Sequence, residues 1–264
     1  MPHVLILGGH GKIAQHLTPL LLRASHTVTS VIRADDQTPT IRGLAPADGR
    51  GTLHVLIRSL EDVTSQDRAQ AILSEGKPDA VVFSAGAGGK GGADRTRIID
   101  RDAATHFLRA ASATPSVKKF ILISYLASRR AQPAWWDAAA WADAQKVNTT
   151  LAAYYDAKVA ADEVLYEAGG ARRDFAAVSL RPGTLTEGDV GGVELGRTGG
   201  AKGEVSRRTV AEVTARLVDA EGLQTSWVDL LDGQEDIDEA VKRVVKEGVD
   251  VAEGEPVYDK VRKA

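Results

Sequence analysis

Short apolar runs alternate with longer amphipathic stretches along most of the chain. The runs lack polar alternation, which is typical of strands buried on both faces of a sheet. They predict strands at residues 4–7, 27–32, 53–57, 80–83, 120–123, 176–180 and 227–231. The amphipathic stretches predict helices at residues 12–23, 65–73, 94–113, 149–167, 206–218 and 235–246. This alternation predicts a doubly wound, mostly parallel α/β sheet.

Two further features of the pattern concern helix starts and one long loop. Ser206 and Asp236 stand where N-caps are useful, each at or just before a predicted helix. Residues 183–203 are rich in glycine, so we expect this loop to be mobile or closely approached by a ligand.

The first predicted strand runs into the turn Gly8-Gly9-His10-Gly11-Lys12-Ile13-Ala14, which has a GxxGxxA spacing. Gly8 permits a sharp turn, and Gly11 lets backbone N–H groups approach a pyrophosphate. The following helix N-terminus favours an anion. A glycine turn that binds nothing is the alternative, but the strand–turn–helix context favours dinucleotide binding. The predicted contact residues are Gly8, His10, Gly11, Lys12 and Ile13.

The end of the second predicted strand indicates which dinucleotide is bound. Arg33 stands there, and a planar guanidinium suits the 2′-phosphate of NADP(H). Lys12 adds a second charge. The alternative is that Asp35 accepts hydrogen bonds from the ribose hydroxyls of NAD(H). Arg33 would then be a solvated cation in the loop. We therefore predict NADP(H), with NAD(H) possible.

Residues after the third and fourth predicted strands complete the cofactor site. Ligands of open α/β sheets bind beyond the carboxyl ends of the strands. Ser59 and Leu60 follow the third strand and are predicted to line the adenine. Small residues follow the fourth strand and let the cofactor lie against the sheet edge, namely Ser84, Ala85 and Gly86. The alternative for each is an ordinary loop residue.

Several segments together resemble the atypical short-chain dehydrogenase/reductases, the NAD(P)H-binding group related to NmrA-like proteins and flavin/biliverdin reductase B. The segments, which reach to about residue 232, are "LILGGHGKIA", "DAVVFSAGAGG", "DRTRIIDRDAATHFLRAA", "KKFILISYLAS", "YYDAKVAADEVLYEAG", "AAVSLRPGTLT" and "SRRTVAEVTARLV". The resemblance implies a single Rossmann-like domain over residues 1–264, to which residues 183–264 contribute a small substrate lobe and tail. It also implies an NADP(H)-dependent oxidoreductase that reduces a small carbonyl or an electron-accepting aromatic compound. The group includes isomerases and sensors too, so epimerisation and non-catalytic NADP(H) sensing remain alternatives.

The resemblance further implies a catalytic set of Ser124, Tyr154 and Lys158. Short-chain reductases use a serine after the fifth strand and a YxxxK pair on the next long helix, and Tyr155 is a rival for the tyrosine. A charged Lys158 would lower the tyrosine pKa and make the phenol a better proton donor. Ser124 would hydrogen-bond the same substrate oxygen. The alternative is a tyrosine that only packs and a lysine that only holds the ribose.

The remaining site residues lie after the sixth strand and in a tryptophan-rich segment. By the resemblance, Pro182, Gly183 and Thr184 face the nicotinamide, whereas Arg181 is structural. Large amphipathic rings indicate a flat or hydrophobic small-molecule substrate. The predicted substrate contacts are Tyr125, Trp135, Trp136 and Trp141. The alternative for the tryptophans is an oligomer contact or a surface flap.

Composition narrows the class of partner. The formal charge of −3 creates no field that gathers nucleic acid or an anionic membrane. No apolar run approaches membrane length, and the first predicted strand leaves no room for a signal peptide. Cysteine is absent, and the six histidines have no metal-ligand spacing, so we expect no metal. We therefore expect a cytoplasmic monomer or homodimer without nucleic-acid or membrane partners.

Overall fold

The computed structural model describes residues 2–88 and 91–263 of the chain. Short extended segments in this part of the chain form ten strands. Their bounds are β1 (His3–Leu7), β2 (Thr27–Ile32), β3 (Thr52–Ile57), β4 (Ala80–Phe83), β5 (Lys119–Ile123), β6 (Ala176–Pro182), β7 (Thr184–Thr186), β8 (Gly192–Gly196), β9 (Glu204–Ser206) and β10 (Ser226–Gly233).

The described strands build one large sheet and one small one. The large sheet has eight strands in the order β3-β2-β1-β4-β5-β6-β10-β8, and β7 pairs with β9 in a separate two-stranded sheet. Neighbours in the large sheet are parallel except β8, which runs antiparallel to β10. The strand order reverses between β1 and β4, so a crevice forms beyond the carboxyl ends of these two strands. The predicted Rossmann-like, mostly parallel sheet is confirmed.

The helical segments follow the strands in alternation. Their bounds are α1 (Lys12–Arg23), η1 (Asp35–Gln37), α2 (Thr38–Arg42), η2 (Leu60–Asp62), α3 (Gln66–Gly76), α4 (Gly92–Thr96), η3 (Arg97–Ala103), α5 (Ala104–Ala113), α6 (Ala138–Thr150), α7 (Ala152–Gly170), α8 (Arg207–Asp219), α9 (Ile237–Glu247) and α10 (Pro256–Arg262). Both predicted N-caps are confirmed, because Ser206 Oγ accepts the amide of Thr209 and Asp236 Oδ1 accepts that of Asp238.

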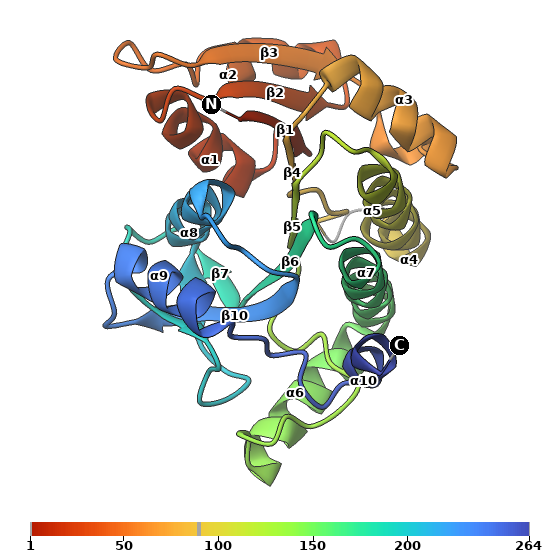
Figure 1. Cartoon of the computed structure of the whole chain (residues 1–264), viewed down its shortest axis with the longest axis vertical. Helices are drawn as coiled ribbons and strands as arrows, with labels where there is room; N and C mark the ends of the chain where they lie inside the picture. Colours follow the sequence, from red (N-terminus) through yellow and green to blue (C-terminus); the bar gives the residue numbers. More distant parts are fainter. Residues whose placement is uncertain (1, 89–90, 264) are drawn as a thin grey trace.

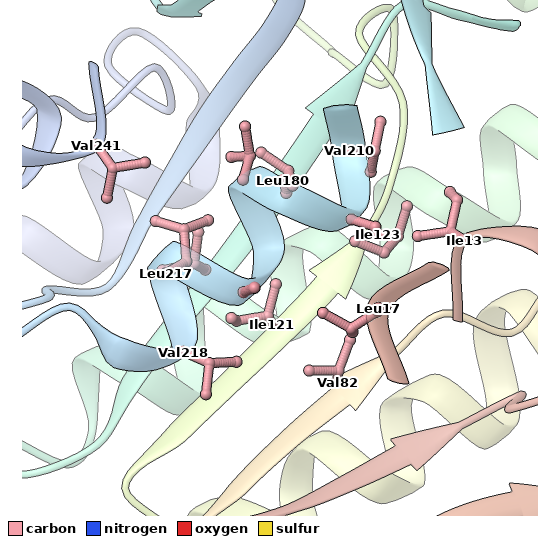
Figure 2. Packing of buried hydrophobic residues seen from close by; sticks show 14 of the residues in the cluster. Ile13, Leu17, Val82, Ile121, Ile123, Leu180, Val210, Leu217, Val218 and Val241 are labelled. Atoms are coloured by element: carbon pink, nitrogen blue, oxygen red, sulfur yellow. The ribbon is translucent and has the colours of Figure 1, made fainter. Parts of the chain in front are cut away.

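Helices cover both faces of the large sheet (Figure 1). Helices α1, α8 and α9 pack on one face, where Ile13, Leu17 and Val210 meet Ile121 and Leu180 of the strands (Figure 2). Helices α3, α5 and α7 cover the other face. Burial of apolar side chains between these layers supplies most of the stabilising free energy. The carboxyl ends of the strands are therefore held rigidly, and the loops that follow them can carry a site.

Three segments differ from the sequence prediction. The expected loop at residues 183–203 contains β7 and β8, whereas α8 and β10 match the predicted helix 206–218 and strand 227–231. Helix α6 was not predicted, and α7 starts at residue 152 rather than 149. The predicted helix 94–113 is interrupted by η3, which is π-helical. Within residues 2–88 and 91–263, no helix combines the length and apolar composition needed to span a bilayer.

Candidate functional site

The glycine turn between β1 and α1 is built for close approach of a ligand. Gly8 has a φ of +85°, and a Cβ placed there would lie 2.6 Å from the Cα of Ala85. The amide of Gly11 donates to the carbonyl oxygen of Gly8 at 2.9 Å and closes the turn. Gly11 is also the N-cap of α1, where no side chain covers the first amide groups of the helix. This turn can hold a pyrophosphate.

A cleft with a volume of about 230 Å³ extends from this turn over the ends of β2, β3 and β4. It contains most of the predicted cofactor residues, namely Gly8, His10, Gly11, Arg33, Ser59, Leu60, Ser84, Ala85 and Gly86. Sequence reasoning missed other lining residues, among them Gln37, Arg58, Glu61 and Arg95. The position and lining of the cleft fit the adenosine half of a dinucleotide.

Three guanidinium groups give this cleft a positive character. Arg33 Nη1 lies 3.8 Å from Glu61 Oε1, and Arg95 Nη2 lies 3.0 Å from the same oxygen. Arg58 also lines the cleft, and its Nη2 lies 2.8 Å from Glu75 Oε2. The cleft is thus lined by three guanidinium groups and the carboxylate of Glu61, which Arg33 and Arg95 share, and guanidinium groups suit a phosphate better than a diol.

Two other predicted cofactor residues have different surroundings. Lys12 is exposed, and its Nζ lies 2.6 Å from Glu187 Oε1, a carboxylate that Arg207 also contacts at 2.9 Å. Ile13 is buried against the core beside α8, so only its backbone can reach a cofactor. The predicted positive charge of Lys12 is thus already partly neutralised.

Tyr154 and Lys158 come together one turn apart on α7. Lys158 is 2% exposed, and its Nζ donates to the carbonyl oxygen of Ile123 at 2.7 Å. The same Nζ lies 3.4 Å from Asp100 Oδ1 and 5.7 Å from the centre of the Tyr154 ring. The ring of Tyr125 stands 5.0 Å from that of Tyr154, centre to centre. Tyr154 and Lys158, the predicted YxxxK pair, therefore lie side by side at the end of β5; we call them the Tyr154–Lys158 cluster.

The electrostatics of this pair differ from the prediction in one respect. Burial raises the pKa of the Tyr154 phenol, and the charge of Lys158 offsets only part of that rise. Burial alone would lower the pKa of Lys158, but the coupling of its titration to that of Tyr154, together with the negative charges of Asp100 and Asp162, outweighs burial and raises that pKa. The expected effect of Lys158 is present, since its charge lowers the Tyr154 pKa, but burial outweighs it and the net shift is upward. Tyr154 is held as a neutral phenol beside a charged ammonium.

Tyr155 faces a different part of the molecule. Its hydroxyl donates to the carbonyl oxygen of Arg129 at 3.2 Å, and it lines a separate cavity of about 350 Å³. Of the two neighbouring tyrosines, Tyr154 is the one beside Lys158.

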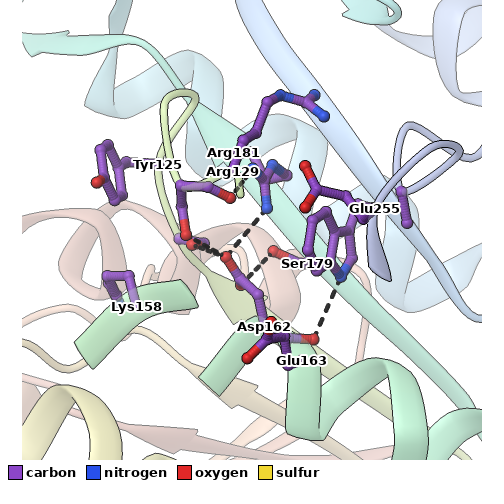
Figure 3. Close-up of polar contacts among 12 residues, drawn as sticks. Tyr125, Arg129, Lys158, Asp162, Glu163, Ser179, Arg181 and Glu255 are labelled. Atoms are coloured by element: carbon purple, nitrogen blue, oxygen red, sulfur yellow. Dashed lines mark hydrogen bonds and ion pairs between the residues drawn. The ribbon is translucent and has the colours of Figure 1, made fainter. Parts of the chain in front are cut away.

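A buried polar cluster around Asp162 includes Ser179 and Arg181 (Figure 3), and Ser124 belongs to it. Ser124 and Ser128 each donate to Asp162 Oδ2 at 2.7 Å, and Ser179 donates to Oδ1 at 2.7 Å. Arg181 Nη1 lies 3.0 Å from Oδ2. Because a serine hydroxyl has one hydrogen, Ser124 Oγ can only accept a further hydrogen bond in this arrangement. The structure does not present Ser124 as the donor that we expected.

The predicted substrate residues are divided between interior and rim. Trp136 is 3% exposed, and its Nε1 donates to the carbonyl oxygen of Thr198 at 2.9 Å, so its ring is core. The guanidinium carbons of Arg129 and Arg197 lie 5.7 Å and 4.9 Å from the centre of the Trp135 ring. Trp141 lines the 350 Å³ cavity together with Tyr155. Tyr125 lies beside Tyr154, and its hydroxyl donates to Asn148 Oδ1 at 2.6 Å. Tyr125 is therefore the predicted substrate residue beside Tyr154, and Trp141 is the one that lines a cavity.

The segment after β6 holds the sheet together at this end. The carbonyl oxygen of Pro182 accepts the amide of Leu126, and the amide of Gly183 donates to Leu230. A Cβ at Gly183 would lie 2.5 Å from the carbonyl oxygen of Gly203, which explains the glycine. Thr184 is exposed. In the described ranges, no group of histidine or carboxylate side chains is arranged to hold a metal ion.

Comparison with known proteins gives consistent matches. The family model described as NAD(P)H-binding matches residues 8–221. A UPF0659 protein of Schizosaccharomyces pombe is 33% identical over 248 residues, covering 92% of this chain and 95% of the relative. The protein named uncharacterized sugar epimerase YhfK of Bacillus subtilis is 28% identical over 242 residues, covering 91% and 99%.

Solved structures show the same fold. A solved structure from Bacillus halodurans, named as an NAD-dependent epimerase/dehydratase, is 27% identical in sequence and has a TM-score of 0.73. The match covers 92% of this chain and 100% of the other. The anaerobilin reductase ChuY of Escherichia coli O157:H7 is 18% identical, with a TM-score of 0.65 and coverage of 89% and 98%. At that identity the similarity concerns the fold alone.

Proposed function

Because the chain belongs to the NAD(P)H-binding family, we propose that it is an NADP(H)-dependent oxidoreductase that reduces a small carbonyl or an electron-accepting aromatic compound. The position of the Tyr154 ring beside the Lys158 ammonium, one turn away on α7, carries this proposal. A phenol kept protonated near neutral pH is a proton donor, which is the group that reduction requires.

The cleft over β2 and β3 supports the choice of NADP(H). Arg33, Arg58 and Arg95 line it, and guanidinium groups bind phosphate oxygens through parallel hydrogen bonds. The glycine turn fits the pyrophosphate, because the backbone at Gly8 and Gly11 leaves no side chain in its way. The residues present therefore fit the dinucleotide.

The chain's own residues have separate roles in the proposed reaction. When bound, the nicotinamide supplies a hydride. Tyr154 donates a proton to the substrate oxygen, and Lys158 holds the ribose and stabilises the phenolate that remains. Tyr125, whose ring lies beside that of Tyr154, contacts the ring or acyl part of the substrate. Ser124 does not donate to the substrate oxygen, since its own hydrogen is donated to Asp162.

Cofactor titration and a substrate panel test this proposal. NADPH should bind more tightly than NADH, by roughly ten- to a hundredfold for one extra charge-assisted contact. A panel of aldehydes, ketones, quinones and flavins should then contain a compound that consumes NADPH in proportion to the product formed. Equal binding of the two nucleotides would contradict the NADP(H) assignment. Tight NADPH binding without turnover on any compound would favour a sensor.

Epimerisation of a sugar is the second candidate, and the names of two matched proteins favour it. An epimerase needs Tyr154 first as a base, to take a proton from a hydroxyl group, and then as an acid. It also returns its cofactor to the starting state. Stereochemical inversion without net change in nicotinamide absorbance would therefore support epimerisation over reduction.

A further inference from the structure

Asp100 is a fully buried carboxylate that the sequence pattern does not single out. It lies in η3, a π-helical segment between α4 and α5, and its side chain is 1% exposed. Short π-helical segments inside α-helices are frequent at functional sites. Burying a charged carboxylate costs free energy unless it is paired or hydrogen-bonded. The groups that contact Asp100 therefore indicate its role.

The two oxygens of Asp100 contact two different parts of the site. Oδ2 accepts the amide of Ala87 at 2.9 Å, in the loop after β4. Oδ1 lies 3.4 Å from Lys158 Nζ on α7. The loop packs tightly against it, since a Cβ at Gly86 would lie 3.0 Å from Oδ1. One carboxylate thus joins the loop that lines the nucleotide cleft to the lysine beside Tyr154.

The surroundings of Lys158 show what Asp100 contributes. The groups that face its ammonium are Tyr154 and Asp162 from α7, Asp100 from η3 and the carbonyl oxygen of Ile123 from β5. Asp162 is shared with three serines and Arg181. Asp100 is therefore the carboxylate within ion-pair distance of Lys158, and without it burial would favour the neutral amine.

We propose that Asp100 is a positioning residue, which holds the Lys158 ammonium and the loop after β4 in one arrangement. The inference rests on the proposed function, in which Lys158 contacts the cofactor ribose. The nucleotide cleft and Tyr154 are then set relative to each other by one side chain. An Asp100 that only supports the packing of η3 and the loop after β4 would leave the protonation of Lys158, and with it the pH dependence of cofactor binding, unchanged when its charge is removed.

Asp100→Asn tests the proposal, because an asparagine oxygen can still accept the Ala87 amide while the charge is lost. Lys158 should then lose its proton at lower pH than in the wild type. NADPH affinity, measured by calorimetry, should fall by about tenfold or more between neutral pH and about pH 9, where the wild type stays level. Asp102→Asn is the matched control on the same helix, since Asp102 pairs with Arg101 near the surface. Equal effects of the two substitutions, or a loss that is the same at every pH, would overturn the proposal.

A second readout separates this proposal from the proposed function. NMR titration of the lysine Cε signals, with the Lys158 signal identified by its loss in Lys158→Met, follows the ammonium directly and needs no ligand. Asp100→Asn should move the Lys158 titration to lower pH, and an unchanged titration would refute the role of Asp100. A wild type that binds no NADPH would refute the proposed function instead, and the NMR result would still decide the link between Asp100 and Lys158.

Discussion

The nucleotide cleft and the Tyr154–Lys158 cluster use charge in opposite ways. In the cleft, Arg33 and its partner Glu61 have side chains that are 56% and 37% exposed. In the cluster, Lys158 is 2% exposed and its partner Asp100 is 1% exposed. Charges of the first kind are screened by water and salt, whereas charges of the second kind are screened much less.

This difference indicates what each region contributes. Exposed guanidinium groups attract a phosphate and add affinity, and losing one leaves the fold intact. Buried ion pairs fix geometry and protonation, and losing one partner leaves an uncompensated charge in the interior. We therefore expect substitutions in the cleft to change cofactor binding and salt dependence. Substitutions in the cluster should change rate and pH dependence.

The largest expected effect is that of Tyr154→Phe in the cluster. The substitution removes the proton donor and keeps the ring that packs on Tyr125. Turnover should fall by on the order of 10²–10⁴, the range for a general acid, while NADPH affinity stays level. Steady-state kinetics and calorimetry measure the two effects, with Tyr155→Phe as the control. Full activity in Tyr154→Phe would show that Tyr154 is not the proton donor. It would also contradict the expectation that cluster substitutions change the rate whereas cleft substitutions change binding.

Gly11→Val should have the next largest effect and act on binding alone. A Cβ at Gly11 would already lie 3.1 Å from the carbonyl oxygen of Gly8, and valine adds methyl groups where the pyrophosphate must approach. NADPH affinity should fall by roughly a hundredfold, since at least one charge-assisted contact is lost. Gly188→Val is the control, because a Cβ there meets nothing closer than 3.5 Å. If the NADPH affinity of Gly11→Val, measured by calorimetry, is unchanged, this turn does not bind the cofactor pyrophosphate.

Arg33→Ala should reduce the preference for NADPH over NADH by roughly ten- to a hundredfold. The effect should shrink as salt is added, because the guanidinium is exposed. Arg42→Ala, on the exposed side of α2, should leave the preference unchanged. A preference that survives Arg33→Ala would assign the phosphate to Arg58 or Arg95.

Glu187→Gln should have the smallest effect. It releases Lys12 and Arg207 from their shared carboxylate, so the glycine turn gains positive charge. NADPH affinity should rise by about two- to threefold at low salt, as expected for an exposed ion pair, and the gain should vanish at high salt. Asp189→Asn, which loses a comparable exposed pair with Arg208, is the control. A loss of affinity in Glu187→Gln would mean that Glu187 itself contacts the cofactor.

The exposed cleft was the easier of the two regions to predict from the sequence. The sequence predicted the cofactor role of Gly8, Gly11 and Arg33, because these residues follow strands whose unbroken apolar runs are easy to recognise. Arg58 and Arg95 could not, because they lie far apart in the chain and meet only through the strand order. The edge strand β8 and helix α6 were missed, since glycine and alanine leave little apolar pattern.

For the Tyr154–Lys158 cluster, the sequence predicted the two residues but neither the net pKa shift of Tyr154 nor the direction of the Ser124 hydroxyl. The YxxxK spacing placed Tyr154 and Lys158 on one helix face. Asp162 is 38 positions from Ser124, so the direction of the Ser124 hydroxyl could not be read from the sequence. Asp100 resembles the neighbouring Asp102 in sequence, and only packing of η3 against α7 buries it. Burial then reversed the expected sign of the Tyr154 pKa shift.

The pH dependence of the single-turnover reduction rate tests most directly the claim that Tyr154 acts as an acid. Burial raises the pKa of Tyr154, so the phenol is protonated throughout neutral pH. The rate should therefore stay level through neutral and mildly alkaline pH, and it should fall only above the ordinary phenol pKa of about 10. The Tyr154→Phe rate should be low at every pH. A wild-type rate that rises through neutral pH, as expected of a phenolate base, would contradict the account.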